Sequence, residues 1–172
     1  MSTLKVDTIQ GKTTSGTVQI TGHVVQVVNV QDGEVASGTT TIAYDDTIMQ
    51  NTEGVEFMTL AITPTSATNK LKIDVVCHCN SSVGNKIFTV GLFQDSTADA
   101  LAMMAETESI ANSPTPVSFT HFMTAGTTSS TTFKVRAGPD SSATITFNGR
   151  DGTNRRGGGR YASSITITEI SQ

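Results

Sequence analysis

The chain has 172 residues and a formal net charge of −4, and only 15% of its residues are charged. This length is typical of one domain, and 36% hydrophobic residues are enough for a single core. The low, slightly acidic charge argues against a nucleic-acid-binding protein that neutralises phosphates. No apolar run reaches the roughly 18 residues of a membrane span. Residues 1–20 lack the apolar region of a secretory signal peptide.

Hydroxyl side chains dominate the composition, with 30 threonines and 17 serines. Threonine favours β-strands, whereas serine and the 15 glycines favour turns. The chain has no tryptophan and only two tyrosines. Its surface is therefore poor in the aromatic residues that dominate many binding hot spots.

Residues 1–21 are polar and rich in glycine and threonine, and they hold too few apolar residues to build a core. Leu4, Val6 and Ile9 are apolar anchors that a simple linker does not need. We therefore expect residues 1–21 to form an extended arm that docks on another chain through these three side chains. A disordered tail is the alternative interpretation. The expected division of the chain is an anchoring arm at 1–21 and a β domain at 22–172.

From residue 23 onward, short segments with strand patterns alternate with turn signals. Segment 71–80 is the clearest central strand, because apolar residues occupy every second position. Segment 98–105 is ambiguous: its alanine, leucine and methionine favour helix, but it is too short for that signal to carry weight. We expect a short strand or a single turn there. The other expected strands are 23–30, 39–44, 55–63, 86–94, 117–125, 131–137 and 143–148.

The last patterned segment, 164–168, has the alternation of a half-buried strand. Ile165 and Ile167 point to one side, and the hydroxyl residues between them point to the other. A final strand has to pair with elements that are already formed, so we expect it to lie between strands from much earlier in the chain. About 8–10 short strands joined by turns predict an all-β fold, an antiparallel jelly-roll sandwich with an extended N-terminal arm.

The inward-facing positions of these strands predict one shared core. Its expected members are Ile73, Val75, Phe88, Val90, Phe119, Phe133, Val135, Phe147, Ile165 and Ile167.

Cys77 and Cys79 are separated by one residue, so on a strand they share a face at a Cα distance of roughly 6.5–7 Å. That distance is at the edge of disulfide geometry, and we expect free buried thiols. Such thiols fit assembly in a reducing cytoplasm. A metal site is disfavoured, because His78 faces the other side of the strand and no second ligand pair follows at a zinc spacing.

No other pattern indicates catalysis or cofactor binding. His23, His78 and His121 lie in different expected strands, without the carboxylate spacing of a metal triad. The G-x-S-x-G elbow of a serine hydrolase is absent, and the glycine-rich segment 157–160 lacks the Lys-Ser/Thr ending of a phosphate loop. We therefore expect no enzyme, no metal and no cofactor.

Segment 150–160 holds the one charge cluster of the sequence. Its members are Arg150, Arg155, Arg156 and Arg160. Two interpretations stay open, a solvated loop and an interface loop that contacts a partner or an acidic ligand.

Three stretches of the sequence resemble small virion proteins of tailed bacteriophages, notably phages of marine bacteria and cyanobacteria. They are the opening TLKVDTIQ at 3–10, the turn at 62–71 that begins ITP and ends NKL, and the ending at 158–170 that begins GGRY and closes with SITITEI. The resemblance implies a tail-fibre or fibre-like protein, assembled as a trimer of jelly rolls and anchored to the particle by its arm. Full-length fibres often carry long shafts, which are absent here, so a short fibre, a fibre tip and a capsid decoration protein all stay open.

On this resemblance the chain works through its surfaces in the virion, after assembly in the host cytoplasm. The first hypothesis is a fibre subunit whose trimeric head contacts the host surface. The alternatives are a capsid decoration protein and a carbohydrate-binding module. The implied partners are further copies of the chain, other virion proteins through the arm, and a host glycan or receptor, with no nucleic acid and no membrane span.

Overall fold

The computed structural model describes residues 21–172. The arm residues Leu4, Val6 and Ile9 lie outside this range. In the described part, the long strands are β1 (Val24–Asp32), β3 (Val55–Ile62), β4 (Lys70–Ser81), β5 (Lys86–Gln94), β6 (Ala102–Glu108), β7 (Thr115–Thr124), β8 (Thr131–Pro139) and β12 (Ser163–Ile170). The short elements are β2 (Ala36–Gly38), β9 (Ile145–Phe147), β10 (Gly149–Arg150), β11 (Asn154–Arg155) and the 3-10 turn η1 (Gly157–Gly159).

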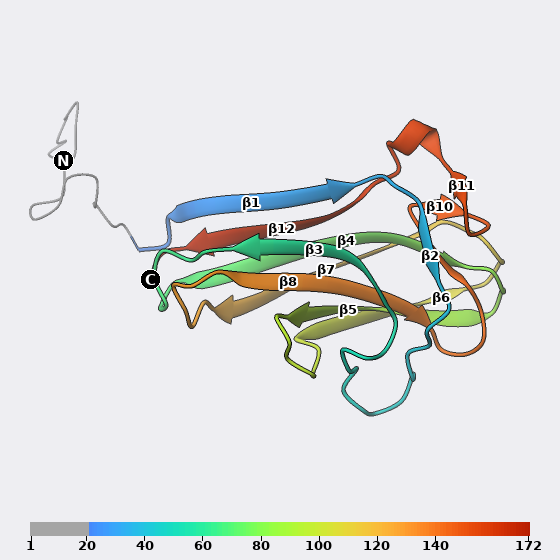
Figure 1. Cartoon of the computed structure of the whole chain (residues 1–172), viewed down its shortest axis with the longest axis horizontal. Helices are drawn as coiled ribbons and strands as arrows, with labels where there is room; N and C mark the ends of the chain where they lie inside the picture. Colours follow the sequence, from blue (N-terminus) through green and yellow to red (C-terminus); the bar gives the residue numbers. More distant parts are fainter. Residues whose placement is uncertain (1–20) are drawn as a thin grey trace, which may run out of the picture.

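The long strands pair from the outside of the sequence inward. β1 pairs with β12, β3 with β8, β4 with β7 and β5 with β6, all antiparallel. β12 also lies beside β4, and β8 lies beside β5. The result is two facing sheets, β1-β12-β4-β7 and β3-β8-β5-β6 (Figure 1). This nested pairing is the jelly-roll arrangement, so the predicted fold class and the position of the last strand are both confirmed.

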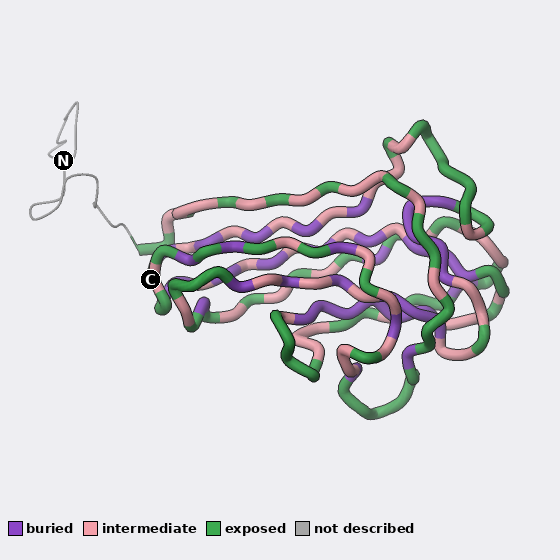
Figure 2. The backbone as a smooth tube through the Cα atoms, viewed as in Figure 1, coloured by how far each residue is buried: buried purple, intermediate pink, exposed green. Residues whose placement is uncertain are grey.

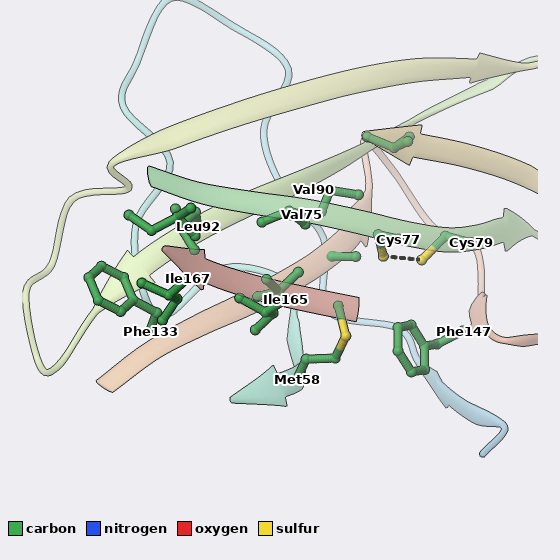
Figure 3. Packing of buried hydrophobic residues seen from close by; sticks show 14 of the residues in the cluster. Met58, Val75, Cys77, Cys79, Val90, Leu92, Phe133, Phe147, Ile165 and Ile167 are labelled. Atoms are coloured by element: carbon green, nitrogen blue, oxygen red, sulfur yellow. Dashed lines mark hydrogen bonds between the residues drawn. The ribbon is translucent and has the colours of Figure 1, made fainter. Parts of the chain in front are cut away.

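The core lies between the two sheets and has contributions from both. Along β4 and β12 buried residues alternate with more exposed ones, as the period of a strand with one face inward requires (Figure 2). Of the predicted core residues, nine are fully buried in one cluster (Figure 3). Phe119 is the exception, because it is only half-buried and packs against the margin of that cluster.

The prediction of a strand at 39–44 is wrong. These residues belong to a loop, 39–54, that lies across the outer face of the β3-β8-β5-β6 sheet. Ile42 and Met49 are buried there against Phe93. A Cβ atom on Gly91 would lie 2.4 Å from Met49 Sδ, so the glycine in β5 gives this loop its room. Ile42 stands among threonines, and this pattern resembled a strand. The side chain instead belongs to a second, small core with Met49 and Phe93.

The ambiguous segment 98–105 contains the start of a strand. Its C-terminal half opens β6, which pairs with β5 through residues such as Met104, opposite Val90. The helix propensity of alanine and methionine is overridden here, because the free edge of β5 offers backbone partners that an isolated short helix lacks.

Candidate interaction surfaces

The three histidines lie at separate places, as expected for structural residues. His23 Nδ1 is 2.9 Å from Ser171 Oγ, and the His78 ring packs on Tyr161 with 4.3 Å between centroids. Burial lowers the pKa of His78 and of His121. Within residues 21–172, no three His, Cys, Asp or Glu side chains form a group that could hold a metal ion, and no helix is long and apolar enough to cross a membrane.

Cys77 and Cys79 are free and fully buried, as predicted, with their Sγ atoms 3.3 Å apart (Figure 3). The hydrogen bond with Cys77 and burial together raise the pKa of the Cys79 thiol well above its usual value. The thiolate is the form that attacks electrophiles and binds metals, so this pair is a part of the core rather than a reactive site.

The chain enters and leaves the sandwich at the same end. Gly22 N–H donates to the carbonyl oxygen of Ser171 at 2.9 Å, and Ser171 N–H donates to that of His23 at 3.0 Å. The β10–β11 hairpin and η1 lie at the opposite end (Figure 1). We call the end with residues 21–23, 63–69 and 170–172 the terminal end. The end with residues 82–85, 109–114 and 149–160 is the distal end.

A fully buried carboxylate, Glu169, organises the terminal end. It accepts hydrogen bonds from Gln26 Nε2 (2.6 Å), Asn69 Nδ2 (2.6 Å), Thr65 N–H (2.8 Å) and Thr65 Oγ1 (2.8 Å). Burial by itself raises the pKa of Glu169, but the donors from Gln26, Asn69 and Thr65 outweigh it and lower the pKa below its usual value. An ionised glutamate therefore ties the turn at 63–69 to β1 and β12.

A second buried carboxylate, Glu108, organises the distal end. It accepts hydrogen bonds from the backbone N–H of Ser81 and, at 2.6 Å, from that of Ser113. Burial raises the pKa of Glu108, and these two bonds only partly offset it. Asn112 N–H also donates to the carbonyl oxygen of Ser81 at 2.7 Å. The loop at 109–114 is thus attached to the end of β4.

Two neighbouring loops at the distal end expose apolar side chains. A Cβ atom on Gly84 would lie 3.0 Å from the Ser109 carbonyl oxygen, so the turn at 82–85 and the loop at 109–114 touch. Val83 is 42% exposed on the first loop, and Ile110 is 73% exposed on the second. We call residues 82–85 and 109–114 the distal tip. Loops held by a rigid scaffold commonly carry binding residues, and the distal tip has that form.

The four arginines predicted as a cluster lie together on β10, β11 and the turn that follows them. We call residues 150–160 the arginine loop. Arg150 Nε lies 3.7 Å from Asp151 Oδ2, and Arg155 Nη2 lies 3.2 Å from Glu34 Oε1. Arg156 and Arg160 are exposed and form no ion pair with any described residue. The loop therefore carries two free positive charges.

The arginine loop owes its path to three consecutive glycines, which end β11 and lead toward β12. Gly157, Gly158 and Gly159 have φ of 54°, 62° and 82°, a left-handed backbone that other residues adopt only under strain. Just before the loop, the Gly149 carbonyl oxygen accepts a hydrogen bond from Asn80 Nδ2 of β4 at 2.6 Å. The arginine loop is therefore held by its base while its arginines face solvent.

A cavity of about 410 Å³ opens between loop 39–54 and the start of β6. Its lining residues are Asp45, Asp46, Thr47, Ile48, Ala100, Leu101, Ala102 and Met103. Asp45 accepts a hydrogen bond from Thr47 N–H at 2.8 Å, and the hydroxyl and backbone donors of Thr47 lower its pKa. Ile48 is 57% exposed beside it, and the neighbouring Tyr44 is 59% exposed. We call this apolar cavity with two carboxylates the acidic pocket.

Sequence reasoning missed the two buried glutamates and the acidic pocket. For Glu169 a signal existed, because it occupies the next inward position after Ile165 and Ile167, where a third apolar residue is expected. For Glu108 and for the pocket no local signal existed, because their partners come from distant loops.

Comparisons with known proteins find similar folds but no family. No protein-family model matches the chain, and no curated protein matches it. A structure of the infectious bursal disease virus Gx strain has 13% identity and a TM-score of 0.47, over 99% of this chain and 37% of that one. The CBM36-1 domain of a multidomain xylanase from the hindgut metagenome of Trinervitermes trinervoides has 12% identity and a TM-score of 0.42, over 83% and 96%. Eiger TNF from S. frugiperda has 8% identity and a TM-score of 0.44, over 85% and 94%.

Similarity at this level concerns the β-sandwich architecture. This chain spans 37% of the length of the viral chain that it matches. The function has to be argued from the surfaces of the molecule itself.

Proposed function

We propose that this chain is a virion structural protein of a tailed bacteriophage, a subunit of a tail fibre or short fibre. Its arm, residues 1–21, attaches it to the particle, and a homotrimeric β head contacts the host surface. It acts through binding surfaces and not through catalysis.

The observation that carries this proposal is the polarity of the sandwich. The chain enters and leaves at the terminal end, where Gly22 and Ser171 are hydrogen-bonded. The distal tip, with exposed Val83 and Ile110, lies at the other end (Figure 1). A protein held by residues that precede Thr21 thus points its apolar loops away from its attachment, as a fibre head requires.

A capsid decoration protein is the alternative, and the same polarity supports it, because an arm at the terminal end can also bind a shell. A carbohydrate-binding module has less support. Sugar sites often use aromatic side chains gathered on one surface. Here the exposed Tyr44 belongs to the loop on one sheet, while the exposed Phe122 lies on the outer face of the other.

Deletion of residues 2–21 tests the proposal. We expect the shortened protein to melt cooperatively, because the described core uses none of these residues, and to be missing from particles. If it is incorporated at the normal copy number, attachment lies on the β domain and the proposed role of the arm is wrong.

The matched control keeps the arm and changes the tip. The double variant Val83→Ser/Ile110→Ser should be incorporated normally, while adsorption of particles to host cells decreases. Normal adsorption, with the protein located on the capsid in micrographs, would instead favour a decoration protein.

A further inference from the structure

We propose that the arginine loop of one copy binds the acidic pocket of the next copy, so that the copies close into a ring. This inference rests on the proposed function, because it specifies the contact that builds the head.

The first half of the contact is the surplus of positive charge on the arginine loop. Two of its arginines already have carboxylate partners within the same copy, Asp151 and Glu34. Arg156 and Arg160 are exposed and have no carboxylate partner in the described part of the chain. The glycines beside them add no side chains that would keep a partner at a distance. These two guanidinium groups are therefore available to another chain.

The second half is the acidic pocket, whose chemistry fits an arginine side chain. Its walls include Ile48, Leu101 and Met103, and its carboxylates are those of Asp45 and Asp46. An arginine buries its aliphatic stem on apolar surface while its planar guanidinium donates to carboxylate oxygens. Charge-assisted bonds of this kind are stronger than neutral ones. A cavity with carboxylates alone would leave the aliphatic stem without apolar contacts, and one with apolar walls alone would leave the guanidinium group without an acceptor.

The positions of the two surfaces determine the kind of assembly. The arginine loop lies at the distal end, where Arg155 pairs with Glu34 and the adjoining Gly149 is bonded to Asn80 of β4 (Figure 1). The acidic pocket borders loop 39–54, which packs on the outer face of the other sheet (Figure 1). A contact between two different surfaces of identical chains is heterologous, and it forms a ring when the rotation closes. A symmetric dimer through two arginine loops is disfavoured, because like charges repel. The proposed homotrimer is a ring of this type.

Charge reversal in the purified full-length chain tests the contact, with sedimentation velocity at several protein and salt concentrations as the measurement. One variant carries Arg156→Glu and Arg160→Glu. The other carries Asp45→Asn and Asp46→Lys, in which asparagine keeps the acceptor for Thr47. We expect each variant to associate at least about tenfold more weakly than the wild type. A chain with all four substitutions should recover a part of the association, because the signs of charge on the two surfaces are exchanged.

The matched control is Lys70→Glu, a charge reversal at the terminal end, which should leave association unchanged. All four substituted side chains are exposed, so we expect every variant to fold. Thermal melting of each variant checks this expectation.

Wild-type association in either charge-reversed variant would overturn the contact, and so would dissociation that the fourfold variant does not reverse. A wild-type chain that stays monomeric at every concentration would also overturn it. The function is tested separately by incorporation into particles. If rings form but never enter particles, the proposed function is wrong and the contact stands. If the protein is incorporated but charge reversal leaves its association unchanged, the contact is wrong and the function stands.

Discussion

The two ends of the sandwich each hold one buried glutamate, and each stabilises its glutamate differently. At the terminal end, Glu169 accepts four short hydrogen bonds from Gln26, Asn69 and Thr65, and its pKa is lowered. At the distal end, Glu108 accepts bonds from the backbone of Ser81 and Ser113, and its pKa is raised. Burial disfavours the charge at both positions, so the number of donors decides the direction of the shift.

This difference fits the proposed polarity of the molecule. The terminal end, which would transmit attachment to the particle, is held by an ionised carboxylate with four donors. The distal end, which would meet the host, depends on a carboxylate that its surroundings destabilise. Loops with fewer and weaker constraints open at a lower free energy than the rest of a fold.

The largest effect should come from the core that both ends share. Phe88→Ala should lower the free energy of unfolding by roughly 3–5 kcal/mol, because it removes a fully buried ring between the sheets. Chemical denaturation measures the loss, and hydrogen exchange should accelerate at both ends alike. A loss under about 1 kcal/mol would place Phe88 outside the core.

The next effect should separate the two ends. Glu169→Ala leaves several buried donors without an acceptor, and we expect a loss of about 3 kcal/mol. Glu108→Ala leaves only two backbone N–H groups without an acceptor, and burial already disfavours the ionised form of this carboxylate. We therefore expect a smaller loss in the free energy of unfolding, about 1–2 kcal/mol. Hydrogen exchange should accelerate at 63–69 in the first variant and at 109–114 in the second. Equal losses with equal exchange patterns would remove the distinction between the ends.

A smaller effect concerns pH. Because the pKa of Glu169 is lowered in the folded chain, its carboxylate stabilises the fold at pH values above its unfolded pKa, near 4.5. This stabilisation is lost as the pH falls through the folded pKa. The raised pKa of Glu108 has the opposite sign, so stability falls as the pH rises from about 4.5 through its folded pKa. Unfolding titrations of Glu169→Gln should therefore differ from the wild type in slope below pH 4.5, and those of Glu108→Gln above it. Identical slopes in both variants would contradict these assignments.

The smallest effect on stability should occur at the distal tip. Val83→Ser and Ile110→Ser should each change the free energy of unfolding by no more than about 0.5 kcal/mol, because both side chains are exposed. Denaturation measures this value, and a loss above about 1 kcal/mol would show that the tip is a part of the fold rather than a free surface.

The sequence predicted the elements whose pattern is decided by one buried face. Segments 71–80 and 164–168 alternate because their odd-numbered residues fill the core, and both are strands. The error at 39–44 has a different physical cause. Ile42 is buried by packing on the outer face of a sheet, and the space for this loop depends on Gly91 and Gly138, far along the chain. No local pattern carries that information.

The candidate surfaces were predictable only where their residues are neighbours in the sequence. The arginine cluster is local in sequence and therefore visible, and its members do lie together. The partner of Arg155 is Glu34, 121 residues earlier, and only the fold places the two side by side. The acidic pocket likewise needs two segments, 45–48 and 100–103, that meet only in the folded chain.

The pairing of β1 with β12 has a consequence for synthesis. Among the described strands, β12 is the one ladder partner of β1, and Ser163–Ile170 are made last of all the strands. At about 5–20 residues per second, β1 waits on the order of 10 s on the ribosome with an unpaired, valine-rich edge. Until β12 pairs with it, neither edge of β1 has a ladder partner among the described strands, and such open edges are templates for aggregation. A polypeptide that stops before Ser163 therefore leaves β1 without its ladder partner and cannot complete the β1-β12-β4-β7 sheet.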